Sequence, residues 1–199
     1  MRKLLVASTN DGKIKEIREQ LKSFDFEIIA LEKFPQLLDI KEDGKSFKEN
    51  ALKKAGVSAE ETGFLTLADD SGLEVDALDG RPGIYSARFS GKNASDEENN
   101  EKLLEELEGV PKEKRSARFR CVMAIYDPEN GYKSTVSGKC EGRILESPQG
   151  ENGFGYDPLF FVNSEKKAMA ELSSDKKNEI SHRAVALNKM KKVIKERFS

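Results

Sequence analysis

Short apolar runs alternate with amphipathic stretches along the first third of this chain. An apolar run at 3–7 predicts a strand, and a polar loop separates it from a helix that we expect to end near Leu21. The helix carries apolar residues at spacings of three and four, namely Ile14, Ile17 and Leu21. A second strand is expected at 26–31, and a capping box at 46–49 predicts a helix through about Glu61.

The second half of the chain changes to longer runs of β type. A second capping box at 95–98 predicts a helix that stops before Pro111. Apolar residues alternate at 117–126, and a turn at 127–131 leads into a strand that runs toward Arg143, which together predict a long antiparallel hairpin. The remaining expected elements are a strand at 159–162 and a last helix that starts at Ser181 and buries Leu187, Met190, Ile194 and Phe198.

Two adjacent acids stand out in the middle of the chain. An apolar run at 64–68 predicts a buried strand, and we expect it to end abruptly in the polar segment 69–72, which begins with Asp69 and Asp70. Carboxylates at the end of a buried strand are costly without a partner, and a divalent cation, a water or backbone N–H groups would relieve that cost. The alternative is an acidic turn that caps a helix, and the residues alone leave both open.

The first polar loop has the position of an anion site. It spans Ser8, Thr9, Asn10, Asp11, Gly12 and Lys13 and joins a strand to the start of a helix. Helix N-termini attract anions through unpaired N–H groups and the helix dipole, and a lysine here adds positive charge. The spacing of a P-loop is absent. The alternative is an ordinary helix cap followed by a solvated lysine.

Two later segments combine polar and aromatic side chains. The loop 150–158 places glycines beside Phe154 and Tyr156, which suits a loop that stacks on a base, although core packing of the two rings explains them equally well. The only histidine, His182, precedes Arg183 at a helix start, where the pair would read an oxygen-bearing ligand or serve a structural role. Glu42 lies in an acidic loop and reads as a surface acid or as a metal ligand, with the residues favouring the surface.

Composition narrows the class of protein. The 199 residues are 37% hydrophobic and 35% charged, which favours one domain over 1–199 with two lobes. No apolar run approaches the roughly 20 residues of a membrane span, and no signal peptide is apparent, so we expect a cytoplasmic protein. Cys121 and Cys140 lie far apart and read as reduced packing residues. The net charge of −2 disfavours nucleic acid as a partner.

Several short motifs occur in an order that resembles one enzyme family, the inosine/xanthosine triphosphate pyrophosphatases. They are Ser8-Thr9-Asn10 with Lys13, Ala68-Asp69-Asp70-Ser71-Gly72-Leu73, Pro82-Gly83-Ile84-Tyr85-Ser86-Ala87-Arg88, Phe154-Gly155-Tyr156-Asp157-Pro158 and Ser181-His182-Arg183. The resemblance covers nearly the whole chain. It implies an elongated α/β protein of two lobes around a long mixed β-sheet, with flanking helices and a central cleft.

The resemblance also implies an activity and a site. It implies hydrolysis of ITP, dITP and XTP to the monophosphate and pyrophosphate, with Mg2+ as cofactor and Mn2+ as a substitute, by a homodimer. By similarity, Asp70 is the general base and a metal ligand, Glu42 is the second metal ligand, and Ser71 contacts the substrate. The loop Ser8 to Lys13 would hold the phosphates, with Lys54 as a further contact. The residues that would hold the base and sugar are Phe154, Gly155, Tyr156, Asp157, Lys177, His182 and Arg183.

Three other functions remain in competition. A septum-inhibitor-like pyrophosphatase of different base specificity would share the fold, but the His182-Arg183 pair and the Phe154 loop argue against it. A non-catalytic sensor would bind the triphosphate without releasing pyrophosphate. A nucleic-acid-binding module is disfavoured by the net charge.

Overall fold

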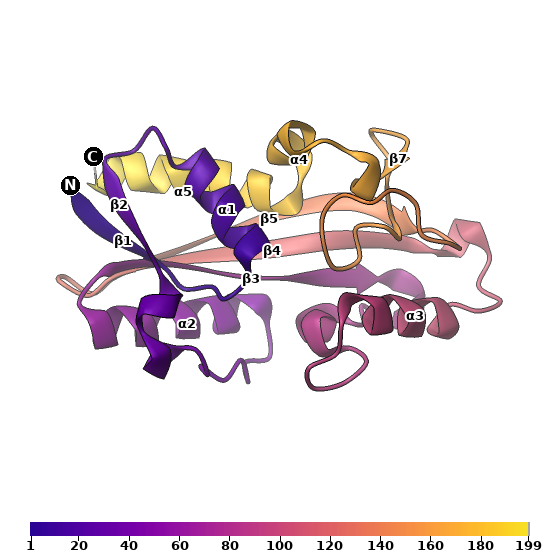
Figure 1. Ribbon diagram of the computed structural model, residues 1–199, viewed down its shortest axis with the longest axis horizontal. Helices are drawn as coiled ribbons and strands as arrows, with labels where there is room; N and C mark the ends of the chain where they lie inside the picture. The colour runs from indigo at the N-terminus through magenta and orange to yellow at the C-terminus, as the bar shows by residue number, and fades with distance from the viewer. Residues whose placement is uncertain (199) are drawn as a thin grey trace. The chain divides into compact units, whose positions relative to one another are not determined.

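A computed structural model of the chain describes residues 1–198 and contains one seven-stranded mixed sheet with flanking helices (Figure 1). The helices are α1 (Asp11–Gln20), α2 (Phe47–Thr62), α3 (Asp96–Glu106), α4 (Ser174–Ile180) and α5 (His182–Phe198). The strands are β1 (Arg2–Val6), β2 (Phe26–Ala30), β3 (Leu65–Val75), β4 (Ser116–Asp127), β5 (Tyr132–Ile144), β6 (Phe160–Val162) and β7 (Lys167–Ala168). The predicted α/β class is therefore confirmed.

The sheet has the strand order β2-β1-β3-β4-β5-β6-β7. The pairs β1–β2 and β1–β3 are parallel, with Leu4 opposite Ile28 on one side and Leu65 on the other. The pairs β5–β6 and β6–β7 are antiparallel. Parallel pairing requires a crossover between strands, and α1 and α2 supply the crossovers that follow β1 and β2.

Contacts divide the chain into two compact units. Unit 1 comprises 1–70, 121–138 and the chain from 185 onward, and unit 2 comprises 71–120 and 139–184. Strands β3, β4 and β5 contribute residues to both units. The organisation of 1–199 as a single domain stays a prediction.

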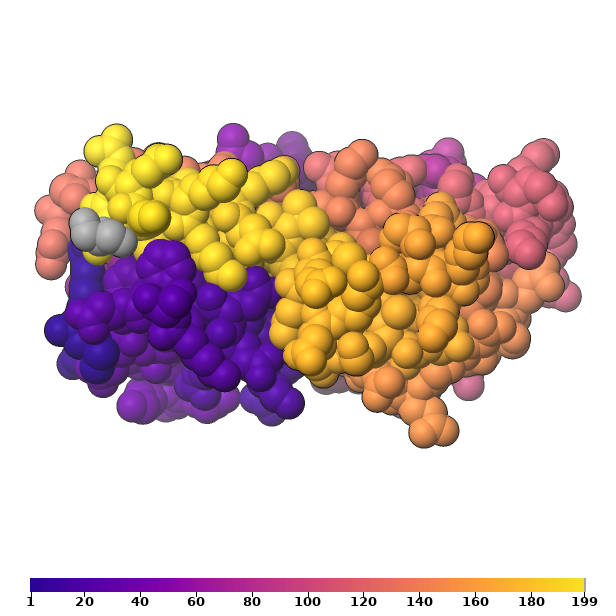
Figure 2. All heavy atoms as spheres, turned by 90° about the horizontal axis from the view of Figure 1, so that it is seen from above, coloured from indigo at the N-terminus to yellow at the C-terminus, as the bar shows by residue number. Residues whose placement is uncertain are grey.

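Unit 1 is built around strands β1, β3 and β4. Helices α1 and α5 lie side by side on one face of its sheet and α2 lies on the other (Figures 1 and 2). Lys191 of α5 donates to the side chain of Gln20 of α1 at 3.0 Å. The core under α1 and α5 consists of Leu4, Val6, Ile14, Ile17, Leu21, Leu65, Leu67, Cys121, Met123, Ile125, Ala186, Leu187, Met190 and Ile194.

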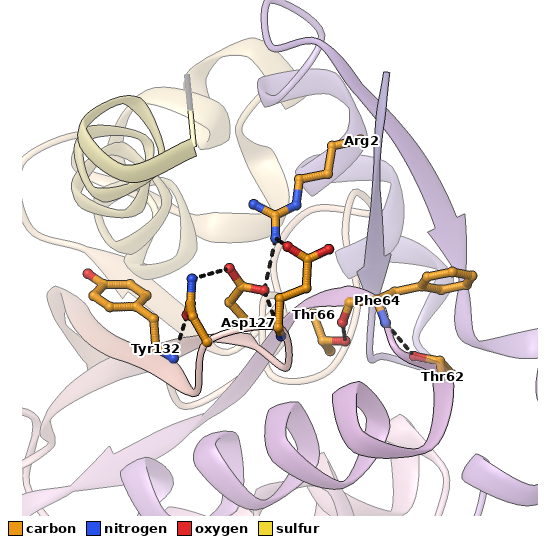
Figure 3. A network of polar contacts seen from close by, with 8 residues as sticks. Arg2, Thr62, Phe64, Thr66, Asp127 and Tyr132 are labelled. Carbon is orange, nitrogen blue, oxygen red and sulfur yellow. Dashed lines mark hydrogen bonds and ion pairs between the residues drawn. The ribbon is translucent and has the colours of Figure 1, made fainter.

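A polar network closes the end of unit 1 where the predicted hairpin turns (Figure 3). Asp127, which is almost fully buried, accepts from the Arg2 guanidinium at 2.8 Å and from Asn130 at 3.0 Å. The Tyr132 ring packs edge-on against Phe198. The network thus ties the first strand, the turn between β4 and β5, and the last helix together, and the predicted hairpin is confirmed.

Unit 2 has its own core. Helix α3 begins with the predicted capping box, in which Ser95 and Glu98 satisfy each other's backbone N–H groups, and it buries Leu103. The buried Arg115 guanidinium donates to the carbonyl oxygens of Leu107 and Val110, which close the chain after α3. The core residues are Leu73, Val75, Leu78, Leu103, Leu107, Ala117, Phe119, Cys140, Ile144, Tyr156, Leu159, Phe160, Val162, Met169 and Leu172.

The expected end of the central strand is wrong. Strand β3 does not stop at the polar segment 69–72 but continues to Val75, and the acidic-turn alternative is wrong with it. The strand continues because Leu73 and Val75 are fully buried in the core of unit 2, and the Leu73 N–H donates to the Ser86 hydroxyl at 2.9 Å. Asp69 and Asp70 therefore lie in the middle of a strand.

Candidate active site

The two acids of β3 face opposite sides of the sheet. Successive residues of a strand alternate between its faces. Leu65 and Leu67 point into the core under α1 and α5, so Asp69 belongs to that face and Asp70 to the face covered by α2. Their partners agree, since Asp69 pairs with Lys13 of α1 and Asp70 with Asn50 of α2. The adjacent acids therefore have different direct partners, although the charges of both act on Lys54.

Asp70 is a buried carboxyl group with a shifted pKa. The residue is 5% exposed, and its Oδ2 accepts a hydrogen bond of 2.9 Å from the Asn50 amide. Burial raises the pKa of Asp70 to about 6, and the negative charge of Glu42 contributes, while Lys54, Asn50 and Lys13 lower it. A carboxyl group with a pKa near 6 is suited to accept a proton close to neutral pH.

Lys54 and Glu42 complete the face of Asp70. Lys54 lies one turn after Asn50 on α2, and its ammonium forms an ion pair of 3.0 Å with Glu42. Burial disfavours the charged form of Lys54, but the carboxylates of Asp69, Glu42 and Asp70 outweigh it and raise the pKa. The lysine is thus held protonated by three carboxylates, of which those of Asp69 and Asp70 are buried. Glu42, whose side chain is 31% exposed, is more than a solvated surface acid.

Lys13 is held by Asp69 on the other face. Its ammonium lies 2.9 Å from Asp69 Oδ2, and the buried Cys121 thiol approaches the same oxygen at 4.0 Å. The side chain of Lys13 is 16% exposed and that of Asp69 is fully buried. The alternative of a solvated lysine therefore does not describe Lys13.

The predicted phosphate loop forms the cap of α1. Asn10 Oδ1 accepts from the Lys13 N–H at 3.0 Å, and the Asn10 N–H donates to the Ser8 hydroxyl at 3.2 Å. Thr9, Asn10 and Asp11 are exposed. The loop thus combines an ordinary cap with exposed residues at the start of a ten-residue helix, the position where anions bind.

Unit 2 gathers the residues predicted to hold a base and sugar. Asp157 and Lys177 form a buried ion pair of 2.8 Å, and the Lys177 ammonium also donates to the Asn152 carbonyl oxygen. Burial raises the pKa of Asp157, and the ion pair with Lys177 opposes that rise. The pair lies under Gly153, where a Cβ atom would collide with both side chains.

His182 and Arg183 lie beside aromatic rings at the start of α5. The His182 ring stacks on Phe119 with the ring centroids 4.8 Å apart, and the Arg183 guanidinium lies 5.5 Å from the centroid of the Phe154 ring. Both residues are buried. Arg183 and Phe154 are thus brought together, and their role in holding a base stays a prediction.

The two aromatics of the loop 150–158 differ in role. Phe154 is half-buried, whereas Tyr156 packs in the core of unit 2 and its hydroxyl donates to the Ser86 carbonyl oxygen at 2.8 Å. Core packing, the alternative that the sequence left open, describes Tyr156. Ser71 follows Asp70 on β3 and is the first residue of unit 2.

Some polar residues near these sites were missed from the sequence. Asp96 and Asn100 of α3 hold both peptide groups of Gly155, with the Gly155 N–H donating to Asp96 at 2.6 Å and Asn100 donating to the Gly155 carbonyl oxygen at 2.9 Å. Asn50 is fully buried on α2. Its signal is an amide on the buried side of a helix, three residues after the buried Phe47.

Two carboxylates of unit 1 suit a hard divalent cation that takes the rest of its ligands from water and substrate. Within residues 1–198 no three His, Cys, Asp or Glu side chains converge on a point. Mg2+ commonly takes only one or two protein carboxylates and completes its shell with water and substrate phosphates. Glu42 and Asp70 would form such a pair, because the negative charge of Glu42 raises the pKa of Asp70 and a cation would relieve that repulsion.

Comparisons with known proteins show the family to which the chain belongs. It belongs to the Ham1 family, whose model matches residues 4–193. It is 56% identical over 191 residues to a protein of Geobacter sulfurreducens named dITP/XTP pyrophosphatase, with 96% of each chain covered. A protein of the same name from Bacillus subtilis is 47% identical over 194 residues, with 98% of each covered.

Solved structures agree with the family. The HAM1 protein from Coxiella burnetii superposes with a TM-score of 0.90 at 43% identity, over 98% of this chain and 100% of that one. The Staphylococcus aureus Ham1 protein gives a TM-score of 0.88 at 40% identity, over 98% and 99%. The family resemblance inferred from the motifs is confirmed. No helix within residues 1–198 is long and apolar enough to cross a membrane.

Proposed function

We propose that this protein hydrolyses the non-standard purine triphosphates ITP, dITP and XTP to the monophosphate and pyrophosphate. The observation that carries the proposal is Asp70, a buried carboxyl group with a pKa of about 6 beside Lys54 and Glu42, in a chain of the Ham1 family. Relatives at 47–56% identity are named dITP/XTP pyrophosphatases, which supports this substrate class.

The residues of unit 1 serve the phosphates and the attacking water. Asp70 acts as the general base that takes the proton of the water, because it is buried, hydrogen-bonded and only weakly acidic. Lys13 and Lys54 supply positive charge for the triphosphate, and the loop from Ser8 to Lys13 offers N–H groups at the start of α1. The ion pairs of both lysines keep their ammonium groups in place before the substrate binds.

Glu42 and Asp70 would hold Mg2+, with Mn2+ as a substitute. When bound, such a cation neutralises charge on the phosphate oxygens. Excess EDTA is expected to abolish pyrophosphate release, and added Mg2+ to restore it, because Lys13 and Lys54 are already paired with carboxylates and cannot balance the charge of a triphosphate by themselves. Full activity in EDTA would contradict the metal assignment. EDTA that has been saturated with Mg2+ beforehand serves as the control, because it adds the chelator without removing the cation.

The residues of unit 2 select the base. The Phe154 ring offers a stacking surface, and Arg183 and His182 offer donors to a purine oxygen. The ion pair of Asp157 and Lys177 lies under Gly153, supports its loop and lies beside the bound base. Ser71 contacts the substrate next to Asp70. We further propose that the enzyme works in the cytoplasm and that it is a homodimer. Light scattering tests the homodimer, because it measures the mass of the purified protein in solution.

A panel of triphosphates tests the proposed function. ITP, dITP, XTP, GTP, ATP and dUTP are incubated with the enzyme and Mg2+, and both pyrophosphate and orthophosphate are measured. Release of pyrophosphate from ITP, dITP and XTP well above the other substrates is expected. Tight binding of ITP without release would favour the sensor, and preference for a pyrimidine or an ordinary purine would favour the septum-inhibitor-like activity.

A further inference from the structure

Asn50 is a fully buried amide that uses both of its ends. Its Nδ2 donates to Asp70 Oδ2 at 2.9 Å, and its Oδ1 accepts from the Gly44 N–H at 2.8 Å. The two partners fix which way the amide faces, since a backbone N–H can only donate and a carboxylate can only accept. The side chain therefore joins helix α2, strand β3 and the loop before α2 through two directed hydrogen bonds.

The loop before α2 carries Glu42 and lies tightly against this amide. A Cβ atom at Gly44 would come within 2.6 Å of Asn50 Oδ1, so the loop backbone approaches as closely as a glycine allows. Glu42 lies two residues earlier and is tied to the same helix by Lys54. Asn50 and Lys54 thus hold the two acids Asp70 and Glu42 from successive turns of α2.

The start of α2 keeps Asn50 in place. The Asn50 N–H donates to the Ser46 carbonyl oxygen, and the Ser46 hydroxyl accepts from the Glu49 N–H at 3.2 Å. The amide therefore projects from the first, capped turn of a sixteen-residue helix. A side chain on such a support has little freedom to follow Asp70 if the carboxylate turns.

We propose that Asn50 is the positioning residue of the reaction, which fixes one oxygen of Asp70 and the loop of Glu42 so that the two acids keep a productive arrangement. The inference rests on the proposed function, in which Asp70 is the general base. Because Asn50 donates to Oδ2 of Asp70 from a fixed position, it sets the direction in which the carboxylate is turned. A general base misplaced by about 1 Å loses much of its effect, since proton transfer depends on a narrow geometry.

The first test compares Asn50→Ala with a control on the same helix. Asn50→Ala is expected to lower kcat for ITP by about 10–100-fold and to leave KM within about threefold, because supporting residues of this kind act on the chemical step. Ser58→Ala is the control, because Ser58 is also fully buried on α2 but its hydroxyl has no hydrogen-bond partner. The control is expected to keep both kcat and KM.

A charge swap separates the contact from a general loss of stability. Asn50→Asp places two carboxylates face to face and is expected to lower the melting temperature at about pH 8. Adding Asp70→Asn to it restores one donor and one acceptor between positions 50 and 70, so the double variant is expected to melt above Asn50→Asp. It stays inactive, because position 70 then holds an amide. If the double variant melts no higher than Asn50→Asp, the hydrogen bond between positions 50 and 70 does not have the role proposed here.

The outcomes separate this inference from the proposed function. Folded Asn50→Ala with the wild-type kcat, beside an inactive Asp70→Asn, overturns the positioning role and leaves the proposed function standing. A rise in KM alone, with kcat unchanged, also overturns it, because that pattern indicates substrate binding. Wild-type protein that releases pyrophosphate from none of the triphosphates overturns the proposed function and the positioning role together.

Discussion

At the residue scale, the central observation is that Asp69 and Asp70 have different partners although they are neighbours in the chain. Asp70 meets an amide and the charges of α2, whereas Asp69 meets the Lys13 ammonium across 2.9 Å. The ion pair commits Asp69 to holding Lys13, whereas the direct partner of Asp70 is a neutral amide. The structure thus favours Asp70 over Asp69 as the general base.

Replacing each acid by its amide tests this difference. Asp70→Asn is expected to keep the fold and to lose about 10²–10⁴ in turnover, because an amide cannot take the proton of the water. Asp69→Asn is expected to be milder and to act mainly on KM, because it loosens Lys13 and leaves the base intact. Rates of pyrophosphate release from ITP, with circular dichroism as the check on folding, compare the two. Near-normal turnover in folded Asp70→Asn would contradict the assignment of Asp70 as the general base.

The raised pKa of Asp70 also predicts how stability depends on pH. The carboxyl has a pKa of about 6 in the folded chain and near 3.8 in the unfolded one, with burial as the main cause. Between these values the folded state binds more protons, so the free energy of unfolding falls as the pH rises from about 4 to about 6. The difference corresponds to about 3 kcal/mol.

Asp70→Asn removes that dependence, because an amide does not titrate. The variant is expected to be more stable than the wild type by up to about 3 kcal/mol at pH values above about 7, and to match it near pH 4. Urea unfolding of both proteins in EDTA across this range measures the effect. Parallel curves for the two proteins would show that Asp70 is not the group that titrates.

At the scale of elements, local signals were predictable and long-range ones were not. The capping box before α3 and the turn between β4 and β5 depend on residues a few positions apart, and both are present. The box predicted before α2 forms by half: Ser46 caps the Glu49 N–H, but the Glu49 carboxylate accepts from the Lys45 N–H instead of the Ser46 N–H. The run of β3 through its acids was not predictable, because Asp69 is buried by a lysine 56 positions earlier in the chain. Helix α4 was also missed, since its polar, lysine-rich sequence hides a buried Lys177.

The candidate site divides along the same line. The motifs contain Asp70, His182 and Arg183, whereas Lys54 was predicted only from the resemblance to the family. Asn50 gave no such signal, because a buried asparagine shows its role only through the two partners that the fold brings to it. Positioning residues are therefore the part of this site that needed the structure.

The loop that carries Gly153 offers a prediction at the scale of an element. Gly153 has a φ of +97°, and a Cβ atom there would collide with Asp157 and Lys177. Gly153→Ala is therefore expected to disturb the ion pair and to raise KM for ITP by about tenfold or more. The positive φ also lowers the stability of any alanine variant here by roughly 1–2 kcal/mol, which a control has to match. Gly131→Ala is the control, with a φ of +70° and open space around it. Equal KM values for the two variants would contradict this account.

At the scale of the whole molecule, two kinds of chemistry belong to two compact units of one chain. Unit 1 holds Lys13, Lys54, Glu42, Asp70 and the loop at the start of α1, all suited to phosphate and metal. Unit 2 holds the aromatic rings and the donors of Arg183 and His182, which suit a base. All nucleoside triphosphates carry the same triphosphate group, so only the residues of unit 2 are able to distinguish one triphosphate from another.

This division predicts different effects of variants in the two units. Lys13→Ala is expected to lower kcat/KM for ITP, XTP, GTP and ATP by a similar factor, because it acts on the shared triphosphate. Arg183→Ala is expected to lower kcat/KM for ITP and XTP far more than for ATP. Hypoxanthine and xanthine present a C6 carbonyl that accepts hydrogen bonds, whereas adenine presents an amino group that donates, and an arginine has donors only.

The size of the effect follows from how such sites discriminate. A site that depends on a hydrogen bond to one substrate atom rejects analogues without it by about 10⁴. Stacking on Phe154 adds affinity for every purine and no selectivity. The measurement is kcat/KM for the four triphosphates in the wild type and both variants. If Arg183→Ala loses no more on ITP than on ATP, Arg183 does not read the C6 oxygen, and the assignment of base selection to this residue is wrong.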